Sequence, residues 1–332
     1  MKITVLYNLP EKNSKDELDT QKSAFGVAEG LKKNYEVGVL GITFNEIENI
    51  KNLKTDFVFN LVEWAGKNSM KGVRVIEELE KARLPYSGSN ARGYELSCNK
   101  EIMKREMEKN NISTPGWQIF EKIQDSGGAN ASRARFKIQE FSYPVILKPV
   151  SEHCGIGIGQ DSVCNNNQET RNKVQAMIKK YNQPVLAEEF IDGRELQVTI
   201  LDKDGKPWVL PPAEVVFAKK EGWKPILSYE GKWDEKSDEY KLSRMELAKL
   251  DRNQELGIRN IARKCYLKLG GRDYPRIDIR LRGDEVFVLE INNNPGIDYD
   301  IESGIGVSAR AVDLSWEGLL KHIVENAYRR KR

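Results

Sequence analysis

The chain has 332 residues, of which 31% are charged and 39% hydrophobic, and its formal net charge is +3. This length suffices for two or three compact units. The chain has no run of about eighteen apolar residues that could form a transmembrane helix, and so small a net charge does not indicate a nucleic-acid partner despite the basic run YRRKR at 328–332. We therefore expect a protein that binds neither a membrane nor nucleic acid.

The cysteines and histidines narrow the chemistry further. The four cysteines show no CxxC spacing, so we expect reduced thiols in a cytoplasmic protein without a zinc site. His153 and His322 are the only histidines, which argues against a histidine-based catalytic triad or a histidine-rich metal site. The start, MKITVLYNLP, has one lysine and a short apolar run, and we interpret it as a first strand and not as a signal peptide. Catalysis would then depend on carboxylates, amides, lysines and arginines.

The first part of the chain alternates predicted strands and helices. We expect strands at 2–8, 35–42 and 56–63, helices at 23–34 and 72–84, and a short strand and turn at 84–89. This alternation predicts an open parallel sheet with helices on its faces. Ligands of such sheets bind at the carboxyl ends of the strands.

The rest of the chain predicts a mixture of helices and antiparallel strands. In order, we expect a helix at 99–111, a loop at 124–133, a strand at 141–150, a glycine-bearing loop at 151–162, a helix at 168–182, strands at 183–190, 194–201 and 208–217, a long mobile loop at 219–242, a helix at 245–269, a hairpin formed by 276–281 and 285–292, and a last helix at 307–328.

Carboxylate and amide side chains gather in the predicted hairpin. Because side chains alternate along a strand, Glu290 and Asn292 share one face, as do Arg276 and Asp278. A two-residue loop would put Asp278 and Glu290 on opposite faces, so we predict a three-residue loop at 283–285 or an equivalent bulge. Two carboxylates and an amide oxygen form a hard ligand set that suits Mg²⁺. The alternative is a hairpin whose polar ends face solvent.

Three lysines are candidates for binding phosphate. Lys100 lies at a helix start, Lys148 ends the apolar strand YPVILK, and Lys232 lies in SYEGKW. Each could equally be an exposed surface lysine, but Lys148 occupies the strand end where ligands of α/β proteins bind.

A glycine-bearing loop follows Lys148 and carries Gly155, Gly157 and Gly159. Such a loop lets backbone N–H groups approach phosphate oxygens closely, although it lacks the GK[ST] sequence of a P-loop and could be a simple turn. In EEFIDGRE, Glu195 follows a glycine turn and could accept hydrogen bonds from ribose hydroxyls, or could simply end a strand.

Taken in chain order, these segments resemble the ATP-grasp enzymes, and specifically the D-alanine–D-alanine ligase family. The similar segments are residues 71–104 with the turn LPYSGS and the helix start NK, then YPVILKPVSEHCGIGI, VLAEEFIDGRE, SYEGKW, RIDIR and LEINNNPG. The resemblance covers almost the whole chain. It implies an ATP-grasp fold, α/β and α+β, with an open parallel-sheet domain at 1–95 followed by two domains, at 96–185 and 186–332, that enclose ATP.

The resemblance also implies a role for each matching residue. Lys100 and Lys148 would contact the ATP phosphates beneath the loop with Cys154 and Gly155, and Asp278, Glu290 and Asn292 would hold two Mg²⁺ ions, or Mn²⁺. The nucleotide would be bound by Glu188, Glu189 and Ile191 at adenine and by Glu195 at ribose. Arg276 would stabilise the oxyanion of the tetrahedral intermediate, Lys232 would reach the transferred phosphoryl group, and Gly296 would help to place the second substrate.

The chain departs from the family pattern at its substrate positions. Cys154 and Gly155 stand where the family has a pair of serines, and Trp233 replaces a tyrosine after the lysine. Ile301 stands at about the place of a serine that binds the second substrate, and the N-terminal glutamate of the family is replaced by Glu17 or Asp19, between which the sequence does not decide.

The family reaction is the formation of an amide bond from a carboxylate and an amine through an acyl phosphate. The resemblance implies amino-acid substrates and a homodimer. Because water would destroy the acyl phosphate, the site must be closed by lids, and the candidates are the loops 151–162 and 219–242. Asp298 and Asp300 could attract the ammonium group of a substrate. The alternatives are a ligase of other amino acids or of a natural-product carboxylate and, less favoured, a nucleotide-binding protein without catalysis.

Overall fold

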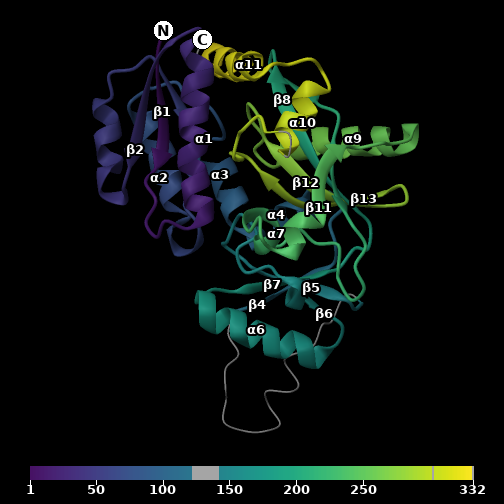
Figure 1. Ribbon diagram of the computed structural model, residues 1–332. Helices are drawn as coiled ribbons and strands as arrows, with labels where there is room; N and C mark the ends of the chain where they lie inside the picture. Colours follow the sequence, from purple (N-terminus) through teal and green to yellow (C-terminus); the bar gives the residue numbers. More distant parts are fainter. Residues whose placement is uncertain (122–141, 301–302, 331–332) are drawn as a thin grey trace.

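The computed structural model describes residues 1–121, 142–300 and 303–330, which form three sheets (Figure 1). The predicted loop at 124–133 and the position of Ile301 lie outside the described residues. In the described ranges, no helix is both long and apolar enough to cross a membrane.

The first sheet has the order β2-β1-β3 and is parallel, as expected. Its strands are β1 (Lys2–Asn8), β2 (Glu36–Ile42) and β3 (Phe57–Asn60). Alternate residues of β3 enter two different apolar cores, so both faces of the sheet are covered. One face packs on α1 (Lys15–Lys32) and the other on α2 (Lys71–Lys81), through apolar residues at helical spacing. The carboxyl ends of β1 and β3 therefore open at one edge of this layer.

Two further helices connect this layer to the second sheet. They are α3 (Ala91–Cys98) and α4 (Lys100–Lys109), each capped by an asparagine, Asn90 and Asn99, whose side chain accepts a backbone N–H. The second sheet has the order β4-β7-β5-β6 and is antiparallel, with strands β4 (Trp117–Phe120), β5 (Val145–Pro149), β6 (Val163–Cys164) and β7 (Val185–Glu189). Helix α6 (Asn167–Tyr181) covers one face (Figure 1).

The third sheet is the largest and has the order β11-β10-β8-β12-β13, with β9 also paired to β8. Its strands are β8 (Arg194–Lys203), β9 (Lys206–Val209), β10 (Ala213–Phe217), β11 (Ser243–Leu247), β12 (Arg276–Arg282) and β13 (Glu285–Asn292). Apolar residues of β8, β12 and β13 pack under α9 (Arg252–Lys268). Because side chains alternate, the opposite face carries Arg276, Asp278 and Arg280.

The last helix, α11 (Trp316–Arg329), returns to the first layer and packs beside α1, so that the two chain ends lie close together (Figure 1). Gly30 of α1 allows this contact, because a Cβ atom there would lie 2.6 Å from Leu320 Cδ1 and 2.6 Å from Trp316 Nε1. One apolar core thus joins the beginning of the chain to its end.

The structure corrects several element predictions. The stretch 219–242 was expected to be a loop but contains two short helices, α7 (Tyr229–Trp233) and α8 (Asp238–Lys241). The stretch expected as one helix from 245 begins with the edge strand β11, and α9 starts only after Asp251. Asp251 is the N-cap that fixes the start of α9, since its carboxylate accepts the N–H groups of Asn253 and Gln254.

Two more predicted elements are divided. The expected strand at 208–217 is split into β9 and β10 by the intervening Pro211-Pro212, which cannot donate to a ladder. The expected helix at 307–328 is split into α10 (Gly304–Arg310) and α11. Asp313 adopts a left-handed backbone with φ 57°, and Ser315 caps the new helix at Gly318 N.

The β12–β13 hairpin has the predicted pairing. Arg282 opposes Glu285, so the loop itself has two residues, but a register shift beyond Ile279 leaves Leu289 unpaired. Asp278 therefore opposes Glu290, and Arg276 opposes Asn292. The bulge that we predicted as the alternative to a three-residue loop is confirmed, and it brings the two carboxylates to one face of the sheet.

Candidate active site

Two adjoining cavities lie between the three layers. The larger, of about 550 Å³, is lined by Glu63, Arg276, Asn292, Asn294 and Gly296 among others. The smaller, of about 80 Å³, is lined by Lys100, Lys148, Glu189, Ile191, Glu195 and Asp278 among others. The residues common to both are His153, Cys154, Leu227, Lys232 and Glu290. A molecule in one cavity would therefore meet a molecule in the other at these five residues.

A buried group of three charges supports the smaller cavity. The Glu188 carboxylate on β7 lies 2.5 Å from Lys104 Nζ and 2.6 Å from Lys148 Nζ. Burial opposes ionisation of Glu188, but the two lysines outweigh it and lower the pKa of that carboxyl. Glu188 is only 1% exposed and lines neither cavity, so its side chain acts on the cavity through Lys148.

The other end of the smaller cavity is formed by the start of β8 and the residues before it. Arg280 donates to Glu195 Oε2 at 2.6 Å and to the carbonyls of Gly193 and Pro225, which fixes the carboxylate of Glu195. Ile191 is 2% exposed and adds an apolar wall. Glu189 lies at the rim, 3.7 Å from Arg282, and a third of its side chain is exposed.

The glycine-bearing loop after β5 covers both cavities and contacts α7. Cys154 and Gly155 both have positive φ, 56° and 79°. Trp233 Nε1 donates to the Cys154 carbonyl at 3.0 Å, and a Cβ on Gly155 would lie 3.2 Å from Tyr229 N. Burial raises the pKa of the Cys154 thiol to about 12, so this group is a neutral thiol at pH 7.

The hairpin residues form one connected group at the junction of the cavities. Arg276 makes two hydrogen bonds to Asp278, Nε to Oδ1 at 2.8 Å and Nη2 to Oδ2 at 3.1 Å, and Asn292 Nδ2 donates to the same carboxylate at 3.3 Å. Glu290 lies 3.9 Å from Lys100 Nζ. Burial opposes its ionisation, but Lys100, Lys148 and Lys232 lower the pKa of Glu290 to about 2.

The donor set of this group suits a hard divalent cation. In the described ranges, no three His, Cys, Asp or Glu side chains are grouped so that they could hold a metal ion. A cation here would therefore depend on two carboxylates and one amide. Asp278 on β12 lies opposite Glu290 on β13, and Asn292 follows Glu290 by two residues on the same strand. Such an open set of three oxygens matches Mg²⁺, which retains waters and phosphate oxygens as further ligands.

The larger cavity has an acidic wall, part of which comes from the first layer. Asp16 and Asp19 of α1 line it together with Asp298 and Asp300. Burial and the nearby Asp298 raise the pKa of Asp19. Glu17 instead accepts the N–H groups of Lys12 and Ser14 at the start of α1. Of the two residues that the sequence left open, Asp19 lines the larger cavity, together with Asp16, and Glu17 does not.

The sequence analysis missed several residues that line the cavities, among them Glu63 and His153. Glu63 lines the larger cavity, and its N–H is held by Asn8 Oδ1 at 2.8 Å, so it lies beside the end of β1. Burial raises the pKa of Glu63 to about 7, against the opposing effect of Arg276. His153 faces both cavities, and burial together with Lys100 lowers its pKa to about 4, so it is neutral. The position of Glu63 just after a buried parallel strand was a signal that could have been used.

The structure brings the predicted residues together. Among the residues to which the resemblance assigned a definite role, all but Glu188 line one or both cavities. The three candidate lysines, which lie far apart in the sequence, all lower the pKa of one carboxyl group, that of Glu290.

The geometry agrees with the comparisons with known proteins. The family sequence model described as D-ala D-ala ligase C-terminus matches residues 107–325. An uncharacterized protein of Sinorhizobium fredii, y4sG, is 30% identical over 82% of this chain and 75% of its own length. A D-alanine–D-alanine ligase of Marinomonas sp. is 29% identical over 91% of this chain and 89% of its own.

A solved structure extends this likeness to the fold. The D-alanine–D-alanine ligase of Bacillus anthracis, crystallised as a complex with ATP, superposes with a TM-score of 0.74 at 22% identity, and covers 100% of this chain and 98% of the other. The predicted ATP-grasp fold is thereby confirmed. From the matched family model and the curated relatives together, the chain belongs to the D-alanine–D-alanine ligase family.

Proposed function

We propose that this protein is an ATP-dependent ligase that joins the carboxylate of one amino acid to the amine of another. The carboxylate attacks the γ-phosphate of ATP, which gives an acyl phosphate and ADP. The amine then attacks the acyl carbon, the amide bond forms, phosphate leaves, and the amine loses a proton. The observation that carries the proposal is the junction at Glu290, where the phosphate-side lysines of one cavity meet Arg276 of the other.

The residues of the smaller cavity would bind ATP. Lys148, oriented by Glu188, and Lys100 would contact the phosphates, and Glu195, oriented by Arg280, would accept from the ribose hydroxyls. The backbone and side chains near Glu188, Glu189 and Ile191 would surround adenine. Since both lysines are already buried and charged, they need little reorganisation when phosphate enters.

The residues at the junction would act on the reacting atoms. Lys232 reaches both cavities and would follow the phosphoryl group as it moves from ATP to the carboxylate. Arg276, which is partly buried and held by Asp278, would stabilise the oxyanion formed when the amine attacks. Asp278, Glu290 and Asn292 would hold Mg²⁺, or Mn²⁺, which neutralises phosphate charge when bound.

Water must be excluded because it hydrolyses an acyl phosphate. We assign this task to the glycine-bearing loop 151–162 and the segment 219–242, which meet through Trp233 and Tyr229. We also propose the three-domain division at 1–95, 96–185 and 186–332, a homodimer and a cytoplasmic location.

The identity of the two substrates is the open part of this proposal. We favour a pair other than two D-alanines, because the thiol of Cys154 and the indole of Trp233 replace the hydroxyl groups usual in the family at this place. The indole N–H of Trp233 is already used on the Cys154 carbonyl. The larger cavity, within the range of about 300–1,000 Å³ typical of drug-sized ligands, has room for side chains larger than methyl.

The test is ADP and phosphate release with Mg-ATP over D- and L-amino acids, singly and in pairs, with product masses. Release with one pair, and a product whose mass is the sum of the two amino acids less one water, supports the proposal and names the substrates. Release with D-alanine alone would contradict our preference for another pair. ATP binding without release for every pair would favour the nucleotide-binding alternative, and the control is Asp278→Asn, which should abolish release while the fold remains.

A further inference from the structure

Glu63 presents a free carboxylate to the larger cavity. It follows β3 closely, lines the larger cavity but not the smaller one, and 24% of its side chain is exposed. Within the described ranges its carboxylate accepts no hydrogen bond, and its only neighbour at ion-pair distance is His153 Nδ1, 3.9 Å away. A molecule in the larger cavity therefore meets a carboxylate that has room for a further partner.

The neighbours of Glu63 place it beside the reacting atoms. His153, which it approaches, belongs to the junction of the two cavities. Arg276 and Lys232 both lower the pKa of Glu63 and Glu290 raises it, so all three lie within electrostatic reach of its carboxylate. In the proposed reaction ATP fills the smaller cavity and Arg276 holds the oxyanion at the acyl carbon. Glu63 then faces that carbon from the larger cavity, through which the amine enters.

The other carboxylates of the junction are less suited to accept a proton. Asp278 already accepts two hydrogen bonds from Arg276, and the pKa of Glu290 is lowered to about 2. The pKa of Asp19 is raised, but its charged neighbours lie on α1 and on the acidic wall and not at the junction. Glu63 is thus the carboxylate that combines access to the larger cavity with proximity to Arg276.

Burial gives Glu63 the proton affinity of a base that works at neutral pH. Because burial raises its pKa to about 7, about half of the molecules carry the ionised carboxylate at pH 7. A catalytic base is most effective when its pKa lies near the working pH. The titratable and charged groups that act on Glu63 come from all the surrounding elements: Asp16 of α1, Tyr94 and Cys98 of α3, His153 and Cys154 of the glycine-bearing loop, Lys232 of α7, Tyr274 before β12, Arg276 of β12 and Glu290 of β13.

The backbone that carries Glu63 is fixed at the ends of two parallel strands. The N–H of Glu63 donates to Asn8 Oδ1 at 2.8 Å, at the end of β1. At the end of β3, the N–H of Asn60 donates to Ser87 Oγ at 3.0 Å, and Asn60 Oδ1 accepts the N–H of Val62 at 3.2 Å. The turn from β3 to Glu63 is therefore held by side chains from the same layer.

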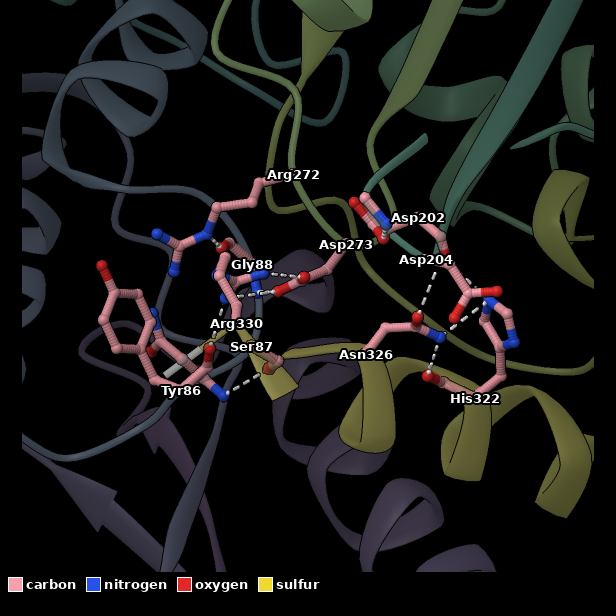
Figure 2. A network of polar contacts seen from close by, with 12 residues as sticks. Tyr86, Ser87, Gly88, Asp202, Asp204, Arg272, Asp273, His322, Asn326 and Arg330 are labelled. Atoms are coloured by element: carbon pink, nitrogen blue, oxygen red, sulfur yellow. Dashed lines mark hydrogen bonds and ion pairs between the residues drawn. The ribbon is translucent and has the colours of Figure 1, made fainter. Parts of the chain in front are cut away.

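The segment that contains Ser87 is anchored in turn by a polar network (Figure 2). The N–H of Gly88 donates to Asp273 Oδ2 at 2.8 Å, and Arg330 donates to the Tyr86 carbonyl at 3.1 Å. Asp273 and Arg330 also form an ion pair with each other. The carboxylate of Glu63 is thus carried by a rigid support and needs little reorganisation when a substrate enters.

We propose that Glu63 is the general base of amide formation, and that its carboxylate takes a proton from the ammonium group of the amine substrate. This inference rests on the proposed function. An N–H bond of the ammonium breaks, its electron pair stays on nitrogen, and the proton passes to Glu63. The nitrogen then attacks the acyl carbon, so that the C–N bond forms and the C–O bond to phosphate breaks. A second proton moves from this nitrogen to the leaving phosphate, which departs as HPO₄²⁻, and Glu63 returns its proton to water when the site opens.

The test compares two amines in the variant Glu63→Gln, which keeps the shape of the side chain but cannot take the proton. Hydroxylamine is already uncharged at pH 7, so it attacks the acyl phosphate without a base and gives a hydroxamate, whereas an amino acid arrives as an ammonium ion. The variant should form the amide roughly a hundredfold more slowly than wild type, while ADP and hydroxamate form at the wild-type rate. Glu36→Gln is the matched control, because it makes the same change in the same sheet at a side chain that is 76% exposed.

The pH profile gives a second readout, which a purely structural role would not change. In wild type, kcat/KM for the amino-acid amine should fall about tenfold per pH unit below about pH 7 and level off above it, because Glu63 must be ionised. Hydroxamate formation should stay level just below pH 7. In Glu63→Gln, amide formation should keep rising above pH 7, because only the free amine reacts.

The outcomes separate this inference from the proposed function. Hydroxamate formation by wild type over the panel of D- and L-amino acids tests the acyl phosphate without involving Glu63. Equal losses of amide and hydroxamate in a folded variant, or an unchanged amide rate, would overturn the role of Glu63 and leave the proposed function intact. If the variant does not fold, the wild-type profiles decide, and the same pH dependence for both amines would overturn the role. If wild type forms neither product, the proposed function fails and the inference fails with it.

Discussion

At the scale of single residues, the site depends on a few groups whose properties are set by burial. Lys148 is buried and Glu290 is partly buried, and both are charged, since each has opposite charges nearby that outweigh the cost of desolvation. At Cys154, Glu63 and His153 the nearby opposite charges do not outweigh burial, which favours the neutral forms. Charge is thus concentrated at the junction of the cavities, where phosphoryl transfer would need it.

The substitution Gly296→Ala should change substrate binding without changing the stability of the fold. A Cβ atom there would meet nothing within 4 Å, and its φ is not in the left-handed region, so the fold tolerates alanine. The added methyl group would project into space beside the cavity that Gly296 lines. Gly296→Ala should leave stability within about 0.5 kcal/mol of wild type and raise the KM for the amine substrate. Calorimetry and steady-state kinetics check this, and a loss of stability with unchanged KM would refute it.

Glu63 gives a prediction about pH. Its folded pKa of about 7 lies above the ordinary value of 4.5, so the folded protein binds this proton more tightly than the unfolded chain does. The resulting stabilisation is complete below pH 4.5 and is lost as the pH rises through about 7. The stability of wild type relative to Glu63→Gln should fall over this interval, by roughly 3 kcal/mol. Urea unfolding of both proteins at several pH values measures the difference, and a constant difference would contradict the assignment.

At the scale of elements, the glycine-bearing loop and α7 act as one cover. Tyr229 N donates to the Ile158 carbonyl, and Trp233 reaches the Cys154 carbonyl, so movement of one segment requires movement of the other. The two segments come from different sheets and lie more than seventy residues apart in the sequence. Their contact closes the junction where the acyl phosphate would form.

Gly155→Ala tests this cover. Position 155 combines a φ of 79° with close approach to Tyr229 N, so a Cβ would strain the loop and push α7 away. A strained position of this kind costs about 1–3 kcal/mol, and we expect ATP affinity to fall about tenfold, with ADP release partly uncoupled from amide formation. Gly205→Ala is the control, since its φ is 76° but nothing lies within 4 Å of its Cβ. Equal effects of the two changes on ATP affinity would show that strain alone, and not the contact with α7, is responsible.

At the scale of the whole molecule, the two ends of the chain form one core. Helices α1 and α11 pack together, and α11 continues into the network of Asp273 and Arg330. The layer that carries Asp19 and Glu63 is therefore held against the layer that carries Arg276 and Asn294, and the larger cavity lies between them.

Gly30→Ala should weaken this joint. Its Cβ would lie 2.6 Å from Leu320 Cδ1 and from Trp316 Nε1, so these packed side chains or the helices must shift, at a cost of about 1–3 kcal/mol. Gly26→Ala on the same helix has open space and should instead stabilise the protein by about 0.5–1 kcal/mol. Thermal unfolding of both variants provides the measurement, and destabilisation by Gly26→Ala of equal size would contradict it.

The sequence by itself determined the class of the fold and the hairpin pairing, and it predicted candidate site residues, most of which line the two cavities. Alternation of apolar residues is a local property, so strands such as β1 and β12 and the shared faces of Arg276, Asp278, Glu290 and Asn292 could be read directly. The same local reading failed where an edge strand or a helix break was decided by partners, as at β11, which depends on β10, and at Asp313 between α10 and α11.

Only the tertiary structure decided which residues meet in the cavities. Glu63 and His153 became site residues because three layers converge on them, and Asp19 was separated from Glu17 because one side of α1 faces the cavity while Glu17 caps its start. Asn294 and Arg330, far apart in sequence, are linked through Gly88 and Asp273. The physical reason is that burial and the distances between remote charges and donors arise only when the layers pack, whereas periodicity is already present in the unfolded chain.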